Sequence, residues 1–288
     1  MKKTLVLAII CFVTLSALTA CAGDNAAFSA NHDITVVSRE DGSGTRGAFI
    51  ELFGVEVKAD DGSKQDMTTE EAVIADKTAI MMTNIAGDPY AIGYISLGSL
   101  NDTVKALQIG GVTASAANIK NGSYVIQRPF NIATKGAADG LAKDFIDFIL
   151  SAEGQAVIGK DYVAIDETAA AYAGNKPSGR IVVGGSSSVT PVMEKLKEAY
   201  VAINSGAEIE IQESDSSAGM TNTMNGTFNI GMASRALKDS ELAELTEIVI
   251  AIDGIAVIVN KENPQNGLSV EQVKNIYIGA IGKWSDVK

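Results

Sequence analysis

The sequence has little of what catalytic and metal sites are built from, since it contains one histidine, His32, and two cysteines, Cys11 and Cys21. His32 precedes the first strand-like run, so a Ser-His-Asp triad has no base in a suitable place. Metal sites need clustered His, Cys or carboxylate ligands, and no cluster here has the spacing of a zinc or calcium site. P-loop and nucleophile-elbow motifs are also missing. We therefore expect no enzymatic activity, no metal and no cofactor.

Positive charge is scarce as well. The 288 residues include 23 Lys and Arg against 35 Asp and Glu, which gives a net charge of −12, and no basic cluster offsets it. Such a surface repels nucleic acid, so nucleic acid is not an expected partner. An anion can still bind where local dipoles outweigh the overall field. With 46% hydrophobic and 20% charged residues, the chain has the profile of a globular protein.

Residues 1–21 have the pattern of a secretory signal, with two lysines followed by an apolar stretch that is too short to cross a membrane. The end of this segment, "LTAC", resembles a bacterial lipobox, in which Cys21 becomes the first mature residue and carries a lipid. The sequence thus predicts an extracytoplasmic protein anchored to the membrane through Cys21, with residues 22–30 as a tether. An ordinary signal peptide with an incidental cysteine is the alternative. Cys11 leaves with the signal, so no disulfide can form within the mature chain.

Strand-like runs such as "DITVVSRE", "RIVVGG" and "IVIAIDGIAVIVN" alternate with helix-like runs such as "TRGAFIELFGV" and "VTPVMEKLKEAYVAI". This alternation predicts an α/β fold with largely parallel sheets. Pro191 suits the first turn of the last of these helices. Its apolar stripe consists of Val192, Leu196, Ala199, Tyr200 and Ile203. Residues 164–180, rich in Ala, Gly and Asp, separate two well-patterned halves and are predicted to be a linker.

The stretch "REDGSGTRGAF", residues 39–49, follows the first strand-like run and is suited to holding an anion. Gly44 lets the backbone approach a ligand, and the hydroxyls of Ser43 and Thr45 are donors. The helix that begins near Thr45 adds free amides and a positive dipole end. Arg39 supplies a full charge, and Asp41 is placed to hold this arginine.

Three further strand-to-helix turns share this chemistry: "RIVVGGSSSVTP", "EIEIQESDSSAGM" and "FNIGMASRAL". The carboxyl ends of parallel strands meet at one edge of a sheet, so we expect the hydroxyls of all four turns to converge on one oxyanion. For each turn taken alone, a helix N-cap is the simpler explanation. The recurrence favours the anion site.

Together with "IDGIAVIVN", "KWSDV", "AIGYISLGSL" and "RPFNIATK", these turns resemble the PstS-type phosphate-binding proteins of ABC phosphate importers, especially lipoproteins of Gram-positive bacteria. The resemblance covers nearly the whole mature chain. It implies a two-lobed periplasmic-binding-protein fold of type II, which closes on its ligand by a hinge. It also implies inorganic phosphate as the ligand, with the permease and ATPase subunits of an importer as partners.

The motifs come in a different order from that of the family. There the "SSSVTP" turn lies near the mature N-terminus and "SREDGSGTR" in the second half, whereas here "SREDGSGTR" comes first and "KWSDVK" ends the chain. The sequence therefore resembles a circular permutant in which residues 164–180 join the ancestral ends. By analogy, one lobe comprises residues 31–124 and 261–288, the other comprises residues 125–260, and the chain crosses between them near residues 125 and 260.

The resemblance also implies the phosphate ligands, residue by residue. They are Arg39, Ser43, Gly44 and Thr45 from one lobe and Ser187, Ser188, Ser216 and Ser234 from the other, with Asp41 and Ser217 in support. Ser234 stands where some family members have an aspartate that accepts the ligand's proton. A serine can donate or accept, so selectivity against sulfate stays open.

Several alternatives remain at this point. An enzyme acting on phosphate esters would share anion-binding turns, but it needs a positioned base or metal. A phosphate-sensing or interaction protein would keep the fold without a role in transport, and the site could take another tetrahedral oxyanion. The C-terminal "SVEQVKNIYIG" could also dock on a second copy of the chain and give a domain-swapped dimer.

Overall fold

The computed structural model describes residues 28–59 and 63–288. The signal segment 1–21 and most of the tether 22–30 lie outside the described residues, so lipidation of Cys21 stays a prediction. Within the described ranges, no helix has both the length and the apolar character needed to cross a membrane.

One sheet of ten strands runs through the molecule in the order β11-β10-β12-β8-β13-β5-β1-β4, with β6 and β9 paired to β13. Its strands are β1 (Thr35–Arg39), β4 (Val73–Ala75), β5 (Ala91–Ser96), β6 (Lys105–Ala106), β8 (Gln127–Thr134), β9 (Val163–Ala164), β10 (Gly179–Ser186), β11 (Ala207–Ser214), β12 (Ile230–Ala233) and β13 (Thr246–Val259). Two small sheets pair β2 (Glu56–Lys58) with β3 (Lys64–Asp66), and β7 (Gln108–Ile109) with β14 (Gly267–Leu268).

The main sheet is mixed, whereas the sequence pattern suggested largely parallel sheets. The outer pairs, such as β10 with β11 and β1 with β4, are parallel. β8 and β13 are antiparallel to each other and to the strands beside them. The reason lies in the chain path, because β8 and β13 carry the chain between the two halves in opposite directions.

The helices connect the strands and cover the sheet. They are α1 (Gly44–Leu52), α2 (Thr78–Gly87), α3 (Ala116–Lys120), α4 (Gly140–Leu150), α5 (Ala152–Ile158), α6 (Thr190–Ile203), α7 (Ser216–Met224), α8 (Asp239–Leu242) and α9 (Val270–Tyr277), with short 3-10 turns η1 (Leu97–Ser99) and η2 (Trp284–Asp286). α6 has proline in its first turn, and it buries Val192, Leu196 and Tyr200 as the stripe predicted. Ile203, the last residue of that stripe, is exposed because it lies where the helix ends.

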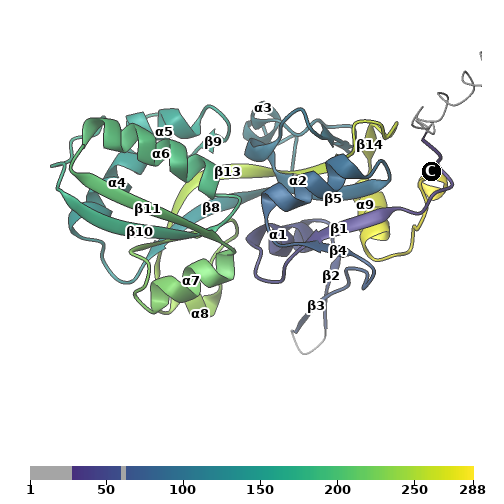
Figure 1. The fold of residues 1–288 in the computed structure, drawn as a ribbon, viewed down its shortest axis with the longest axis horizontal. Coiled ribbons are helices and arrows are strands. Elements are labelled where there is room, and N and C mark those ends of the chain that lie inside the picture. Colours follow the sequence, from purple (N-terminus) through teal and green to yellow (C-terminus); the bar gives the residue numbers. More distant parts are fainter. Residues whose placement is uncertain (1–27, 60–62) are drawn as a thin grey trace, which may run out of the picture.

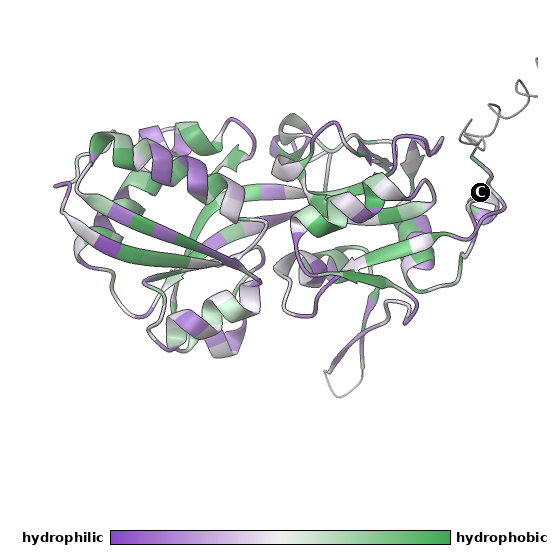
Figure 2. Ribbon diagram, in the orientation of Figure 1, coloured by the Kyte–Doolittle hydropathy of each residue, from purple (hydrophilic) through white to green (hydrophobic). Residues whose placement is uncertain are grey.

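Buried side chains form two large clusters, which we call the cores of the first and second lobes. The first core includes residues of β1, α1, α2, β5 and α9, and the second includes residues of α4, α5, α6, β10 and β12. Figure 1 shows the two lobes side by side, joined by β8 and β13. Figure 2 shows hydrophobic residues concentrated in the central strands of each lobe.

The chain crosses between the lobes within β8 and β13. Ile126 belongs to the first core and Phe130 to the second, which places one crossing at the start of β8. In β13, Ala251 belongs to the second core and Ile255 to the first. The second crossing was expected near residue 260. It lies several residues earlier, because Ile255–Val259 already pair with β5 in the first lobe.

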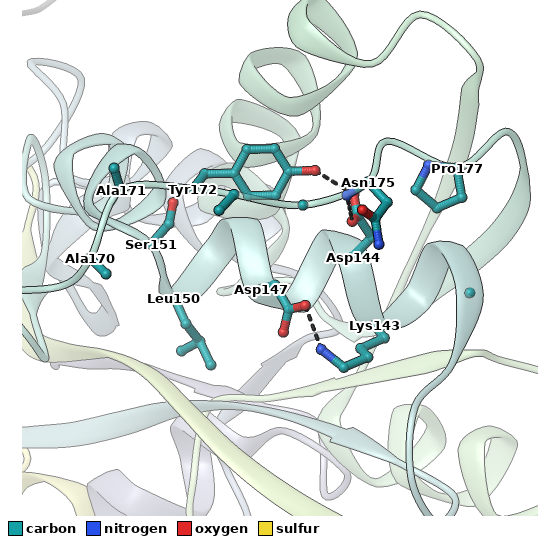
Figure 3. Close-up of a pocket in the computed structure, with 13 residues that line it drawn as sticks. Lys143, Asp144, Asp147, Leu150, Ser151, Ala170, Ala171, Tyr172, Asn175 and Pro177 are labelled. Atoms are coloured by element: carbon teal, nitrogen blue, oxygen red, sulfur yellow. Dashed lines mark hydrogen bonds and ion pairs between the residues drawn. The ribbon is translucent and has the colours of Figure 1, made fainter.

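The segment predicted as a linker, residues 164–180, packs on α4 and α5. Asp144 of α4 accepts a hydrogen bond from the hydroxyl of Tyr172, and another from the amide of Asn175 at 2.8 Å. Burial raises the pKa of Asp144, but the hydrogen bonds from Tyr172 and Tyr200 outweigh it and hold the pKa below its ordinary value. A groove of about 610 Å³ lies between α4 and this segment (Figure 3). The segment is therefore fixed on the surface of the second lobe.

The two ends of the described chain lie side by side on the first lobe. The amide of Ile34 donates to the carbonyl of Gly282 at 2.7 Å, and the amide of Ser285 donates to the carbonyl of Ala30 at 2.8 Å. Trp284 is buried there, so it serves as the packing residue that the sequence suggested.

Candidate anion-binding site

The turn after β1 is shaped by a glycine and by a helix cap. Ser43 is the N-cap of α1, and its hydroxyl accepts a hydrogen bond from the amide of Arg46 at 3.3 Å. A Cβ on Gly44 would lie 2.4 Å from Oγ of Ser216 and 2.8 Å from Oγ of Ser234. Glycine therefore lets the start of α1 come this close to the second lobe.

Side chains of the first lobe contact the serines that follow β10. The hydroxyls of Thr45 and Ser188 are hydrogen-bonded at 2.8 Å, and Nη2 of Arg39 donates to Oγ of Ser187 at 3.1 Å. All four side chains are buried. The ends of β1 and β10, which belong to different lobes, thus meet at one place.

Ser234, at the end of β12, lies among hydroxyls from three other turns. Its hydroxyl accepts a hydrogen bond from Oγ of Ser186 at 2.9 Å and lies 3.5 Å from the hydroxyls of both Ser216 and Thr45. Its amide donates to Oγ of Ser216 at 3.1 Å. We call the side chains that meet here the hydroxyl cluster: Arg39, Thr45, Thr78, Ser186, Ser187, Ser188, Ser216 and Ser234.

The carboxylate beside Arg39 is that of Glu40, not that of Asp41. Glu40 accepts hydrogen bonds from Nε of Arg39 at 2.8 Å and from Nη2 at 2.7 Å, in the two-bond geometry typical of arginine and carboxylate. The side chain of Asp41 is 96% exposed and pairs with Arg46 at 2.8 Å. The prediction that Asp41 holds Arg39 is therefore wrong, because the turn before α1 directs Asp41 outward.

Ser217 lies beside the cluster and joins α7 to the first lobe. Its amide donates to the carbonyl of Gly42 at 3.2 Å, and its hydroxyl accepts a hydrogen bond from Nη2 of Arg235 at 3.3 Å. Arg235 is in turn paired with Glu241 at 2.8 Å. The supporting role of Ser217 toward an anion stays a prediction.

Thr78, Ser186 and Glu40 belong to the site although the sequence did not single them out. The hydroxyl of Thr78 lies 3.2 Å from that of Ser187. Nη1 of Arg39 donates a hydrogen bond to the hydroxyl of Thr78 at 3.4 Å. Thr78 opens α2 shortly after β4. The signal was a fifth strand-to-helix turn, "VIADKTAIMM", which is inconspicuous because it contains neither glycine nor serine.

The cluster combines hydroxyls, helix N-termini and one guanidinium. α1, α2 and α7 begin at residues of the cluster or directly beside them, and α6 begins two residues after Ser188. Such helix starts offer free amides and positive dipole ends to an anion. Among the described residues, no three His, Cys, Asp or Glu side chains form a group that could hold a metal ion. The arrangement is suited to enclosing a small oxyanion by neutral donors and one cation.

Known proteins share both the sequence and the fold. A family model described as "PBP superfamily domain" matches residues 20–153 and 170–288. A protein of Streptococcus agalactiae, named "Phosphate-binding protein PstS 2", is 50% identical over 289 residues, which cover 99% of this chain and 98% of that protein. Its namesake in Streptococcus pneumoniae is 42% identical over 274 residues, 94% of each chain.

A solved structure agrees with these sequence matches. It is the crystal structure of a phosphate-binding protein of a phosphate ABC transporter from Streptococcus pneumoniae, which is 42% identical and matches with a TM-score of 0.70. The match covers 89% of this chain and 100% of that chain. Since the alignment with the Streptococcus agalactiae protein spans nearly all of both chains, the order of segments seen here is shared with that relative.

Proposed function

This chain belongs to the PstS family of phosphate-binding proteins, within the periplasmic-binding-protein superfamily, and we propose that it binds inorganic phosphate between its two lobes. The observation that carries the proposal is the hydroxyl cluster, in which turns from both lobes meet around the buried Arg39. The cluster hydroxyls form hydrogen bonds with one another in this structure. An oxyanion bound between the lobes would accept hydrogen bonds from these hydroxyls in their place. We propose that it acts as a binding protein and not as an enzyme.

The proposed ligands of phosphate are those implied by the sequence, extended by the structure. They are Arg39, Ser43, Gly44, Thr45, Ser187, Ser188, Ser216 and Ser234, to which the structure adds Thr78. Arg39 supplies the positive charge, and Glu40 fixes its orientation through two hydrogen bonds. The hydroxyls and helix amides then surround the remaining oxygens.

Calorimetric titration of the mature protein tests this proposal. We expect saturable binding of inorganic phosphate with one site per chain. Sulfate titrated in parallel distinguishes a phosphate site from a general site for tetrahedral oxyanions. An absence of phosphate binding down to millimolar sensitivity would defeat the proposal, and turnover of a chromogenic phosphate ester would point to an enzyme instead.

We propose that the protein acts outside the cytoplasm and delivers phosphate to the permease and ATPase subunits of an ABC importer. The motivation is the secretory pattern of residues 1–21 together with the transporter-linked relative of known structure. The finer part of the proposal is a lipid anchor on Cys21. Mass spectrometry of the protein from membranes should show a lipidated N-terminal Cys21, and a Cys21→Ser variant should appear in the soluble fraction. An unmodified N-terminus on a soluble wild-type protein would contradict the anchor.

We also propose that the segment order is a circular permutation joined by residues 164–180. The adjacent ends of the described chain support this, because the hydrogen bonds of Ile34 with Gly282 and of Ala30 with Ser285 bring them together. A chain that starts near residue 180, with a short link from residue 288 to residue 28, should fold and bind phosphate. Failure of such a chain to fold would argue against the permutation.

A further inference from the structure

A buried ion pair lies where the chain crosses between the lobes. Nη2 of Arg128, on β8, donates to Oδ2 of Asp253, on β13, at 3.1 Å, and both side chains are almost fully buried. The two residues are directly opposite each other in the ladder between these strands. Figure 2 shows hydrophilic residues on the crossing strands between the two lobes. The pair therefore joins the two strands that connect the lobes.

Both lobes contact this pair from either side. Tyr162, which belongs to the second core, packs against Gly98 of η1 so closely that a Cβ there would lie 2.2 Å from its ring. The amide of Gly98 donates to Oδ1 of Asp253 at 3.5 Å. On the other side, the guanidinium of Arg128 lies over the ring of Phe130 at 5.5 Å. A change in the pair would therefore alter contacts in both lobes.

Burying the ion pair costs desolvation free energy, so the pair contributes little to the stability of the fold by itself. Nε and Nη1 of Arg128 are buried and have no hydrogen-bond partner among the described residues. Buried charges repay their desolvation only when their remaining donors are satisfied, and apolar replacement of such pairs is often neutral or stabilising. Stability alone therefore gives little reason for a pair at this position.

The pair lies on the same sheet as Arg39 of the proposed phosphate site, two strands away. Burial lowers the pKa of Arg128 to about 10 against the opposing effect of Asp253, and the positive charge of Arg39 lowers it further. β13 and β5 lie between the strands of the two arginines, and Tyr94 on β5 accepts a hydrogen bond from the amide of Arg39 at 3.1 Å.

We propose that Arg128 and Asp253 are positioning residues for the phosphate site. Their ion pair fixes β8 against β13 where the lobes join, and thereby sets the geometry in which Arg39 and the hydroxyl turns meet when the lobes close. The inference rests on the proposed function. In this inference the pair sets the angle between the lobes and does not contact the ligand.

The decisive variant is Arg128→Met/Asp253→Leu, which removes both charges and keeps the site apolar and filled. We expect an unchanged or higher melting temperature together with phosphate binding at least 10-fold weaker by calorimetry. The control is Lys195→Gln/Asp161→Asn, which removes an exposed ion pair of 2.7 Å outside the crossing strands and should change neither quantity. Should the first variant fail to fold, Arg128→Lys keeps the charge but changes the geometry, and it should bind phosphate at least 3-fold more weakly.

A distance measurement separates positioning from a general structural role. Spin labels at Glu70→Cys and Thr221→Cys, two exposed sites in different lobes, report closure in a Cys21→Ala background. We expect phosphate to give the wild type one narrow distance and the charge-free variant a shifted or broad one. Affinity within twofold of wild type with wild-type distances overturns the inference, and so does a parallel loss of affinity and melting temperature. If the wild type itself binds no phosphate, the proposed function fails and takes this inference with it.

Discussion

The hydroxyl of Thr45, in the first turn of α1, lies 2.8 Å from the hydroxyl of Ser188, in the turn after β10. One residue belongs to the first lobe and the other to the second, so this contact joins the two lobes directly. The same holds for the bond from Arg39 to Ser187. A phosphate ion held at this place would therefore be bound by both lobes at once, and its binding free energy would favour closure.

Replacing Arg39 with alanine should weaken phosphate binding by about 1.5 to 3 kcal/mol, the range for a hydrogen bond to a charged group. The side chain is buried and supplies the cation of the hydroxyl cluster. Calorimetry with phosphate measures the effect. Arg180→Ala, which removes an exposed arginine of the second lobe, is the matched control and should bind as wild type does. Wild-type affinity in the Arg39 variant would remove this residue from the site.

Gly44→Ala should impair closure, while Gly47→Ala on the same helix should not. A Cβ at position 44 would lie 2.4 Å from Oγ of Ser216, so this hydroxyl would have to turn away from the site, whereas at position 47 the nearest atom is 4.0 Å away. We expect at least a 10-fold loss of phosphate affinity, roughly 1.4 kcal/mol, for the first variant only. Calorimetry and small-angle scattering with phosphate measure affinity and closure. Equal behaviour of the two variants would contradict the close approach of the lobes.

The convergence of the turns could be predicted because it depends on local sequence signals and on one rule of sheet architecture. Glycine and serine directly after a strand-like run mark the turns at Ser43, Ser187 and Ser216. The parallel-strand rule accounts for Ser187 and Ser216, which follow the neighbouring strands β10 and β11, whereas Ser43 follows β1 and meets them from the other lobe. The place of Thr78 in the site could not be predicted, because its turn contains neither glycine nor serine. Which of the two neighbouring carboxylates, Glu40 or Asp41, pairs with Arg39 could not be predicted either, since this depends on the direction of the turn.

Longer-range features could not be predicted from sequence patterns. Asp144 lies in an amphipathic helix, and nothing local shows that Tyr172 and Tyr200 donate hydrogen bonds to it and so fix the linker. The crossing near residue 260 follows only from analogy with the family, because "IDGIAVIVN" contains no local signal for a boundary between lobes. Which core each part of that run enters is decided by its strand partners, and register of this kind is a property of the whole sheet.

Ser234→Asp should raise the preference for phosphate over sulfate at least 10-fold. The serine is fully buried among the hydroxyls of the cluster, and its oxygen can donate or accept a hydrogen bond. A carboxylate there can accept a hydrogen bond from the hydroxyl of hydrogen phosphate, whereas fully deprotonated sulfate would leave the new charge unpaired. Competition calorimetry at pH 7 gives the ratio of the two affinities, with Ser217→Asp as a control beside the cluster. An unchanged ratio in Ser234→Asp would place the ligand away from this residue.

The buried carboxyl of Asp253 should make stability depend on pH in a direction opposite to that of ordinary ion-paired acids. Burial raises its pKa from 3.8 to about 6, despite the lowering effect of Arg128. Between these values the folded chain holds a proton that the unfolded chain has lost, so the stabilisation is full below pH 3.8 and is lost as the pH rises through about 6. Asp253→Asn cannot ionise and lacks this dependence. Urea unfolding of both proteins from about pH 4 to pH 7 should therefore show the stability of the wild type falling relative to the variant, and a constant or rising difference would contradict the raised pKa.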